Sequence, residues 1–122
     1  MTGGRWQPAG VELASTARTT IGAGMAKPLP AAEIDAALAG LSGWKLAGDA
    51  LAKDFQFRSF REAMTFMVRV AFEAEAMEHH PDWTNVYNRV AIRLNTHDAG
   101  GKVTAKDVEL AQRIERCAGT QN

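Results

Sequence analysis

The residues of this chain that are best suited to chemistry are its three histidines, which lie close together in the sequence. His79 and His80 are adjacent, and His97 follows seventeen residues after the second of them. An imidazole ordinarily titrates near neutral pH, so it can give and accept protons, and its neutral form binds metal ions. The cluster therefore predicts a site for proton transfer or for a metal.

The segment between the histidines has the pattern of a β-hairpin. Val90, Ile92 and Leu94 alternate with more polar residues, which is the period of a half-buried strand. If Tyr87 and Asn88 form a two-residue turn, residues 78–80 lie level with residues 95–97 on the opposite strand. All three imidazoles would then lie at the open end of one hairpin.

Length and composition restrict the classes of protein that are possible. A chain of 122 residues is long enough for one domain. Its 14 basic and 14 acidic residues balance, so we expect no direct binding to nucleic acid or to a membrane surface. The single Cys117 cannot form an internal disulfide, and no apolar run is long enough to span a bilayer. A cytoplasmic protein is the expectation, with Cys117 buried as a small apolar residue.

The beginning of the chain differs from the rest. Residues 1–27 are rich in Gly, Ala and Thr, show no hydrophobic period and lack the apolar segment of a secretory signal. We expect a disordered extension there and a folded domain over residues 28–119.

The first half of that domain predicts a helix, a hairpin and a second helix. Apolar residues recur at helical spacing over residues 31–39. The Gly48-Asp49 turn separates two short alternating segments, which predicts the hairpin. Ser59, with Glu62 three residues later, is the pattern of a capping box, and the helix that it begins extends to about Met77.

The second half repeats this arrangement. After the hairpin between the histidines, residues 98–101 form a tight turn, and Thr104 with Asp107 predicts the capped start of a last helix. The order is α-β-β-α-β-β-α. This predicts an α+β domain, in which helices pack on one face of a four-stranded antiparallel sheet made of two hairpins.

The long helix carries more apolar surface than one sheet face requires. Two stripes run along it: Phe60, Met64, Met67 and Ala71 on one side, and Ala63, Phe66, Val70 and Met77 on another. A domain of this size covers only one of them, so we expect a homodimer or homotetramer.

An ordered set of residues resembles the pterin-4a-carbinolamine dehydratases over about residues 29–118. The set comprises Gly43-Trp44, Phe55-Gln56-Phe57, Glu78-His79-His80-Pro81-Asp82-Trp83, Asn85-Val86-Tyr87-Asn88, Thr96-His97-Asp98, Gly101 and Asp107. The resemblance implies a lyase that needs no cofactor and acts on a small pterin. Such an enzyme eliminates water from a 4a-hydroxytetrahydropterin to give the quinonoid dihydropterin, which recycles the cofactor of aromatic amino-acid hydroxylases.

The same resemblance implies roles for individual residues. His79, His80 and His97 would be catalytic, with His79 and His97 as acid and base and His80 holding the substrate. The expected substrate-binding residues are Glu75, Pro81, Trp83, Thr96, Asp98 and Asp107. A carboxylate among them could instead orient a histidine, and Trp83 could stack on the pterin or belong to the core.

Three other interpretations stay open at this point. Three histidines can bind zinc, although adjacent histidines tend to point apart in an extended chain, and we expect no metal. The chain could be an oligomeric regulatory module, like the animal relatives that act as transcriptional coactivators, or a pterin- or molybdopterin-related protein without dehydratase activity. Finally, the histidines could be no more than a polar rim of the hairpin.

Overall fold

The computed structural model of the chain describes residues 26–119. The expected extension over residues 1–27 lies outside the described residues, apart from its last two. The described part forms helices α2 (Ala31–Ala39), α3 (Phe60–Met77) and α4 (Ala105–Gly119), the short 3-10 turn η3 (His97–Ala99), and strands β1 (Lys45–Ala47), β2 (Ala50–Gln56), β3 (Asp82–Val86) and β4 (Arg89–Leu94). The predicted α+β class and element order are confirmed.

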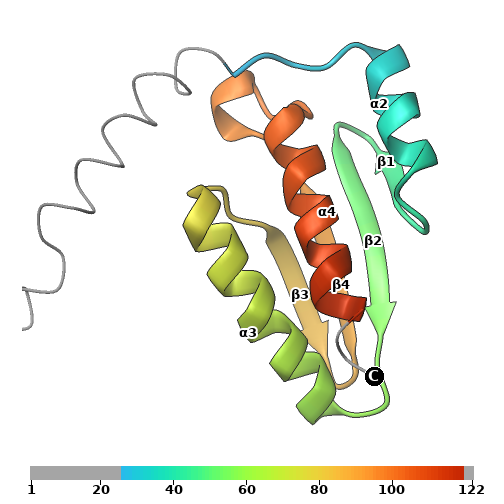
Figure 1. Ribbon diagram of the computed structural model, residues 1–122, viewed down its shortest axis with the longest axis vertical. Coiled ribbons are helices and arrows are strands. Elements are labelled where there is room, and N and C mark those ends of the chain that lie inside the picture. The colour runs from blue at the N-terminus through green and yellow to red at the C-terminus, as the bar shows by residue number, and fades with distance from the viewer. Residues whose placement is uncertain (1–25, 120–122) are drawn as a thin grey trace, which may run out of the picture.

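The four strands form one antiparallel sheet in the order β1-β2-β4-β3. The middle strands are the apolar ones. Leu51 and Phe55 of β2 pair with Leu94 and Val90 of β4, and all four side chains are buried. Helices α3 and α4 lie side by side over one face of the sheet, while α2 lies beside its β1 end (Figure 1). One face of the sheet is thus covered, as predicted.

The core fills the space between the sheet and helices α3 and α4. Its helical members are Ala63, Phe66, Val70 and Ala74 of α3 and Leu110, Ala111, Ile114 and Cys117 of α4. The ring of Phe66 lies 4.9 Å from that of Phe55, measured between centroids. Burial raises the pKa of the Cys117 thiol, so this side chain is a poor nucleophile at neutral pH and acts as a small apolar residue.

The second hairpin has the register expected from a turn at Tyr87 and Asn88. Val86 pairs with Arg89 directly beside the turn, and the ladder continues to the pair Asp82 and Arg93. It ends there, so the expected alignment of residues 78–80 with residues 95–97 does not continue as paired strand. Pro81 has no N–H to donate to a ladder, which accounts for the end of the pairing.

Both predicted helix caps are present, but they differ in detail. The Ser59 hydroxyl accepts from the Glu62 N–H at 3.1 Å. The Glu62 carboxylate binds the Arg58 guanidinium at 2.7 Å, and this hydrogen bond lowers the pKa of Glu62. At the start of α4 both hydrogen bonds of the capping box are present. The Asp107 carboxylate accepts from the Thr104 N–H at 2.8 Å, and the Thr104 hydroxyl accepts from the Lys106 N–H at 3.2 Å.

No helix in the described part of the chain is long and apolar enough to cross a bilayer.

Candidate active site

The predicted site residues gather at one end of the sheet. Helix α3 ends there and β3 begins there, while β4 ends and leads through η3 into the start of α4; in Figure 1 these segments meet at the upper end of α4. Residues that are far apart in the chain are thereby brought together at one edge of the helix layer.

The end of α3 determines where the two adjacent histidines lie. Glu78 adopts the left-handed conformation, with φ 55° and ψ 41°. The His79 N–H then donates back to the Ala74 carbonyl at 3.0 Å, which closes the last turn. A left-handed residue other than glycine costs on the order of 1–3 kcal/mol, so the surrounding contacts must hold this turn. It leaves His79 buried and His80 exposed.

His79 forms the shortest contact of the site. Its Nε2 atom lies 2.6 Å from Oδ1 of Asp107, on the first turn of α4. Asp107 has no exposed surface, and His79 retains 9 % of its own. A carboxylate removed from water in this way needs hydrogen-bonding partners, and the imidazole is one of them.

The second oxygen of Asp107 has two further partners. Oδ2 accepts from the Thr104 N–H and from the Thr96 hydroxyl, each at 2.8 Å. The two threonine hydroxyls lie 2.7 Å apart, and both threonines are buried. The sequence indicated Thr104 only as a helix cap. Its contact with Thr96 joins the end of β4 to the start of α4 and was not predicted.

His80 belongs to a separate, exposed pair. Its Nε2 atom lies 2.8 Å from Oε1 of Glu75, five residues earlier and in the last turn of α3. The side chains of His80 and Glu75 are 63 % and 77 % exposed. Pro81 follows directly and restricts His80 to extended backbone conformations. The two adjacent imidazoles therefore bind different carboxylates and point in different directions.

His97 and Asp98 are exposed on η3, directly after the buried Thr96. The turn is a single 3-10 turn followed by Gly100 and Gly101, both with positive φ, and it ends where Thr96 pairs with Lys102. Only glycine adopts these φ values without a steric cost. His97 thus directly follows Thr96, whose hydroxyl binds Asp107.

Trp83 lies on the edge strand β3, paired with Ile92. It is partly buried and packs against the core cluster. Because Ile92 points toward the helices, so does Trp83, on the same side of the sheet as His79. The contact supports a role in the core and leaves part of the ring accessible.

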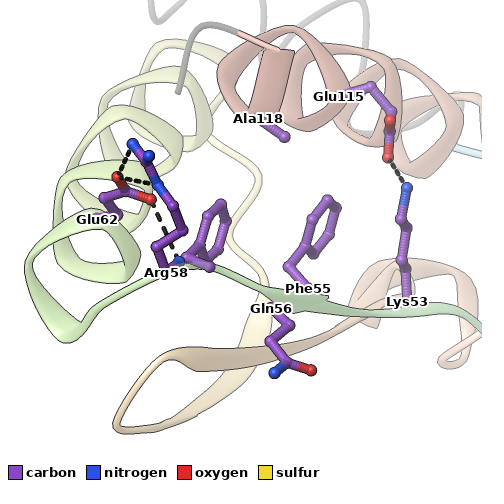
Figure 2. A pocket seen from close by; sticks show the side chains of 8 residues that line it. Lys53, Phe55, Gln56, Arg58, Glu62, Glu115 and Ala118 are labelled. Atoms are coloured by element: carbon purple, nitrogen blue, oxygen red, sulfur yellow. Dashed lines mark hydrogen bonds and ion pairs between the residues drawn. The ribbon is translucent and has the colours of Figure 1, made fainter. Parts of the chain in front are cut away.

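A hollow lies at the opposite end of the helix layer. It has a volume of about 780 Å³ and is lined by residues of β2, the start of α3 and the end of α4. Figure 2 shows Phe55 between two charged pairs, Arg58 with Glu62 and Lys53 with Glu115. None of the histidines lines it, and its charges neutralise each other. Helix α3 separates the hollow from the histidines by roughly 27 Å, at 1.5 Å per residue.

Within residues 26–119 there is no group of three or more His, Cys, Asp and Glu side chains that could hold a metal ion. The geometry instead provides two histidine–carboxylate pairs and a third, exposed imidazole. Such groups can give and accept protons on a small molecule at the surface, which is acid–base chemistry.

Comparison with known proteins identifies the family of this chain. A sequence model of the family described as pterin 4 alpha carbinolamine dehydratase matches residues 27–117. A protein of Opitutus terrae is 65 % identical over 88 residues, covering 72 % of this chain and 91 % of its own. One of Mesorhizobium japonicum is 54 % identical over 88 residues, covering 70 % and 89 %. Both carry the name pterin-4-alpha-carbinolamine dehydratase provisionally.

A solved structure supports the same conclusion for the fold. The crystal structure of a transcriptional coactivator/pterin dehydratase from Brucella melitensis is 37 % identical, has a TM-score of 0.73, and matches over 75 % of this chain and 99 % of that one. Taken together, the fold and these comparisons identify an α+β dehydratase. The chain belongs to the pterin-4a-carbinolamine dehydratase family.

Proposed function

We propose that this protein eliminates water from a 4a-hydroxytetrahydropterin, giving the quinonoid dihydropterin. The observation that carries the proposal is the buried His79–Asp107 pair at 2.6 Å, formed beside His80 and His97 in a chain of this family. The reaction would recycle the pterin cofactor of an aromatic amino-acid hydroxylase.

The chemistry requires two proton transfers. The C4a–O bond breaks, and the leaving hydroxide takes up a proton to become water. A ring nitrogen loses a proton as the new carbon–nitrogen double bond forms. One proton is given and one is taken, so an acid and a base on the enzyme suffice and no redox partner is consumed. Each such group commonly contributes about 10²–10⁴-fold to the rate.

His79 and His97 are assigned to these two transfers. His79 is held by Asp107, whose Oδ1 lies 2.6 Å from Nε2 of the ring and orients it. His97 is exposed on η3 and free to meet a substrate from solution.

His80 is assigned to binding the substrate, and the carboxylates of Glu75 and Asp107 are assigned to orienting the histidines. His80 holds and polarises the pterin, with its ring oriented by Glu75. Asp107 is fully buried, which favours the role of orienting His79 over contact with the pterin. Pro81, Trp83, Thr96 and Asp98 remain proposed as the surroundings of the substrate; the burial of Thr96 suits an indirect role.

The test is direct. Purified protein is added to freshly generated 4a-hydroxytetrahydropterin, and the absorbance of the quinonoid product is followed against the uncatalysed reaction. A first-order rise that scales with enzyme concentration supports the proposal. A rate equal to the uncatalysed one, with protein that is folded by circular dichroism, would favour a family member without dehydratase activity.

The proposed chemistry requires no metal. We expect the rate to be unchanged after treatment with a chelator and desalting, because the acid and base are imidazoles and not a metal-bound water. Elemental analysis of the purified protein should return much less than one equivalent of zinc. Stoichiometric zinc that is lost together with activity would show that the assignment of the histidines is wrong.

The outer side of α3 supports a homodimer or homotetramer. Phe60, Val68 and Phe72 are 47 %, 48 % and 72 % exposed. Val68 and Phe72 lie one turn apart on the side of α3 away from its buried stripe, with Phe60 at the start of the same helix, and a monomer would leave this apolar surface in water. A second copy of the chain is the partner that we propose.

We expect light scattering to report a dimer or tetramer at micromolar concentration, and Phe72→Glu to shift it toward the monomer. Gln112→Glu, which adds the same charge to an exposed position of α4, is the matched control and should leave the mass unchanged. A monomeric wild-type protein would contradict the proposal. It would also make the same surface available to another protein, as in a coactivator, the word used for the Brucella protein.

A further inference from the structure

The buried threonines beside Asp107 form a chain of hydrogen bonds whose direction can be derived. It begins at the Lys106 N–H, passes through the hydroxyls of Thr104 and Thr96, and ends on Oδ2 of Asp107. Thr96 and Thr104 are 4 % and 2 % exposed, so these hydroxyls have little access to water as an alternative partner.

Each step is fixed by the number of protons that are available. A hydroxyl has one proton to donate. The Thr96 proton goes to the Asp107 carboxylate at 2.8 Å, so the contact of 2.7 Å between the two hydroxyls must be donated by Thr104. The Thr104 oxygen in turn accepts from the Lys106 N–H at 3.2 Å, which can only donate. Every group in the chain is then satisfied in a single arrangement.

The same count of donors and acceptors extends to His79. Oδ2 of Asp107 already accepts two hydrogen bonds, from the Thr96 hydroxyl and the Thr104 N–H. The remaining oxygen, Oδ1, accepts from Nε2 of His79, and this places the ring proton on Nε2. Within the described residues the other ring nitrogen, Nδ1, has no hydrogen-bond partner.

We propose that Thr96 is a positioning residue for the dehydration: through Asp107 its hydroxyl keeps a proton on Nε2 of His79, so that Nδ1 is the atom that exchanges a proton with the substrate. This assignment rests on the proposed function for its use of Nδ1, but not for the tautomer itself. As a base, neutral His79 takes a proton on Nδ1; as an acid, the imidazolium gives one up from Nδ1. In both cases Nε2 keeps its proton, which is hydrogen-bonded to Asp107.

The first measurement needs neither substrate nor activity. Long-range ¹H–¹⁵N NMR of the imidazole nitrogens distinguishes a ring protonated on Nε2 from one protonated on Nδ1. For the neutral His79 ring of the wild-type protein we expect the Nε2–H form, with the signal assigned by its loss in His79→Gln. A wild-type ring protonated on Nδ1 would overturn the proposal, because the proton would then lie on the carboxyl side of the pair.

The second measurement compares variants of Thr96. Thr96→Val keeps the shape and removes the hydroxyl, so we expect kcat to fall about 10-fold, the size associated with one hydrogen bond to a charged group, while KM stays within about twofold. Thr96→Ser restores the hydroxyl and should return kcat to within about threefold of wild type. Thr84→Val, on the exposed outer side of β3, is the matched control and should change neither constant.

The outcomes separate the positioning role from a structural one and from the proposed function. If Thr96→Val melts lower but keeps kcat and the Nε2–H signal, Thr96 is merely structural and the inference fails. If Thr96→Val does not fold, two results still test the proposal. They are the tautomer of His79 in the wild-type protein and the kcat of Thr96→Ser, which should lie within about threefold of wild type. If the wild-type protein has no dehydratase activity but its His79 signal is Nε2–H and is lost in Thr96→Val, the proposed function fails while the hydrogen-bond assignment stands.

Discussion

His97→Ala should lower kcat by about 10²–10⁴-fold while the melting temperature stays close to that of wild type. The ring lies on the exposed turn η3, so its removal leaves no cavity and no buried group without a partner. The effect should fall on kcat more than on KM, since a proton transfer is an interaction made chiefly in the transition state. Steady-state kinetics and thermal unfolding of the same preparation provide both readouts.

His79→Ala should lower kcat by a similar factor, but it also leaves Asp107 buried without its imidazole partner. Its stability must therefore be measured beside its activity, and His79→Gln is the better-packed second variant. If the two histidines act as a pair, the double variant should lose less than the product of the single losses, because a disabled pair cannot be disabled twice.

His80→Ala is the comparison that distinguishes substrate binding from the proton transfers assigned to His79 and His97. His80 is exposed, and among residues 26–119 its ring pairs only with Glu75, so its loss should raise KM at least as much as it lowers kcat. A result in which His80 alone governs turnover, while His97→Ala resembles wild type, would show that the division of roles among the three histidines is wrong.

The parts of the fold that the sequence predicts well are those encoded within a few residues. Ser59 begins α3, and Tyr87 with Asn88 forms the turn that sets the register of the second hairpin. A cap and a two-residue turn depend on contacts between near neighbours, so residue type and spacing are sufficient to identify them.

The order of the strands is not encoded in this way. The pairing of β2 with β4 joins two hairpins that are separated by the whole of α3. It follows from burial, since the strands with the most apolar side chains lie in the middle of the sheet, and burial depends on the complete tertiary structure. The composition of β4 and β2 is consistent with the observed order but does not by itself exclude others.

The sequence brings His79, Thr96 and Asp107 forward as candidates, but it does not predict the hydrogen bonds that join them. The sequence places Thr104 and Asp107 three residues apart, and both form the expected cap. It allows a carboxylate to orient a histidine, but spacing alone does not show that this one binds His79, 28 residues earlier, and Thr96, 11 residues earlier. The alternation of β4 suggested that the histidines would meet through strand pairing. The ladder ends at the pair Asp82 and Arg93, before Pro81. Asp107 of α4 instead joins His79 to Thr96, the neighbour of His97, while His80 pairs separately with Glu75.

Asp107 is the residue whose replacement should have the largest combined effect on stability and turnover. Its carboxylate accepts hydrogen bonds from the Thr104 N–H, the Thr96 hydroxyl and the His79 ring, all buried. Asp107→Ala leaves these donors without an acceptor, at about 1–3 kcal/mol for each group that water cannot reach. We expect a loss of roughly 3–5 kcal/mol and a melting temperature lower by about 15 °C or more. Denaturant titration and thermal unfolding measure this loss.

Asp107→Asn separates the two effects, because the amide has nearly the same shape as the carboxylate. Its oxygen can accept from both threonine groups, which retains much of the stability. Its NH₂ group then faces Nε2 of His79 and can only donate, so the ring proton must move to Nδ1. With the reacting nitrogen in the wrong protonation state, kcat should fall by about 10²–10⁴-fold in a protein that melts well above Asp107→Ala. An Asp107→Asn variant with nearly wild-type turnover would contradict the proposed action of the carboxylate on His79, whatever its stability.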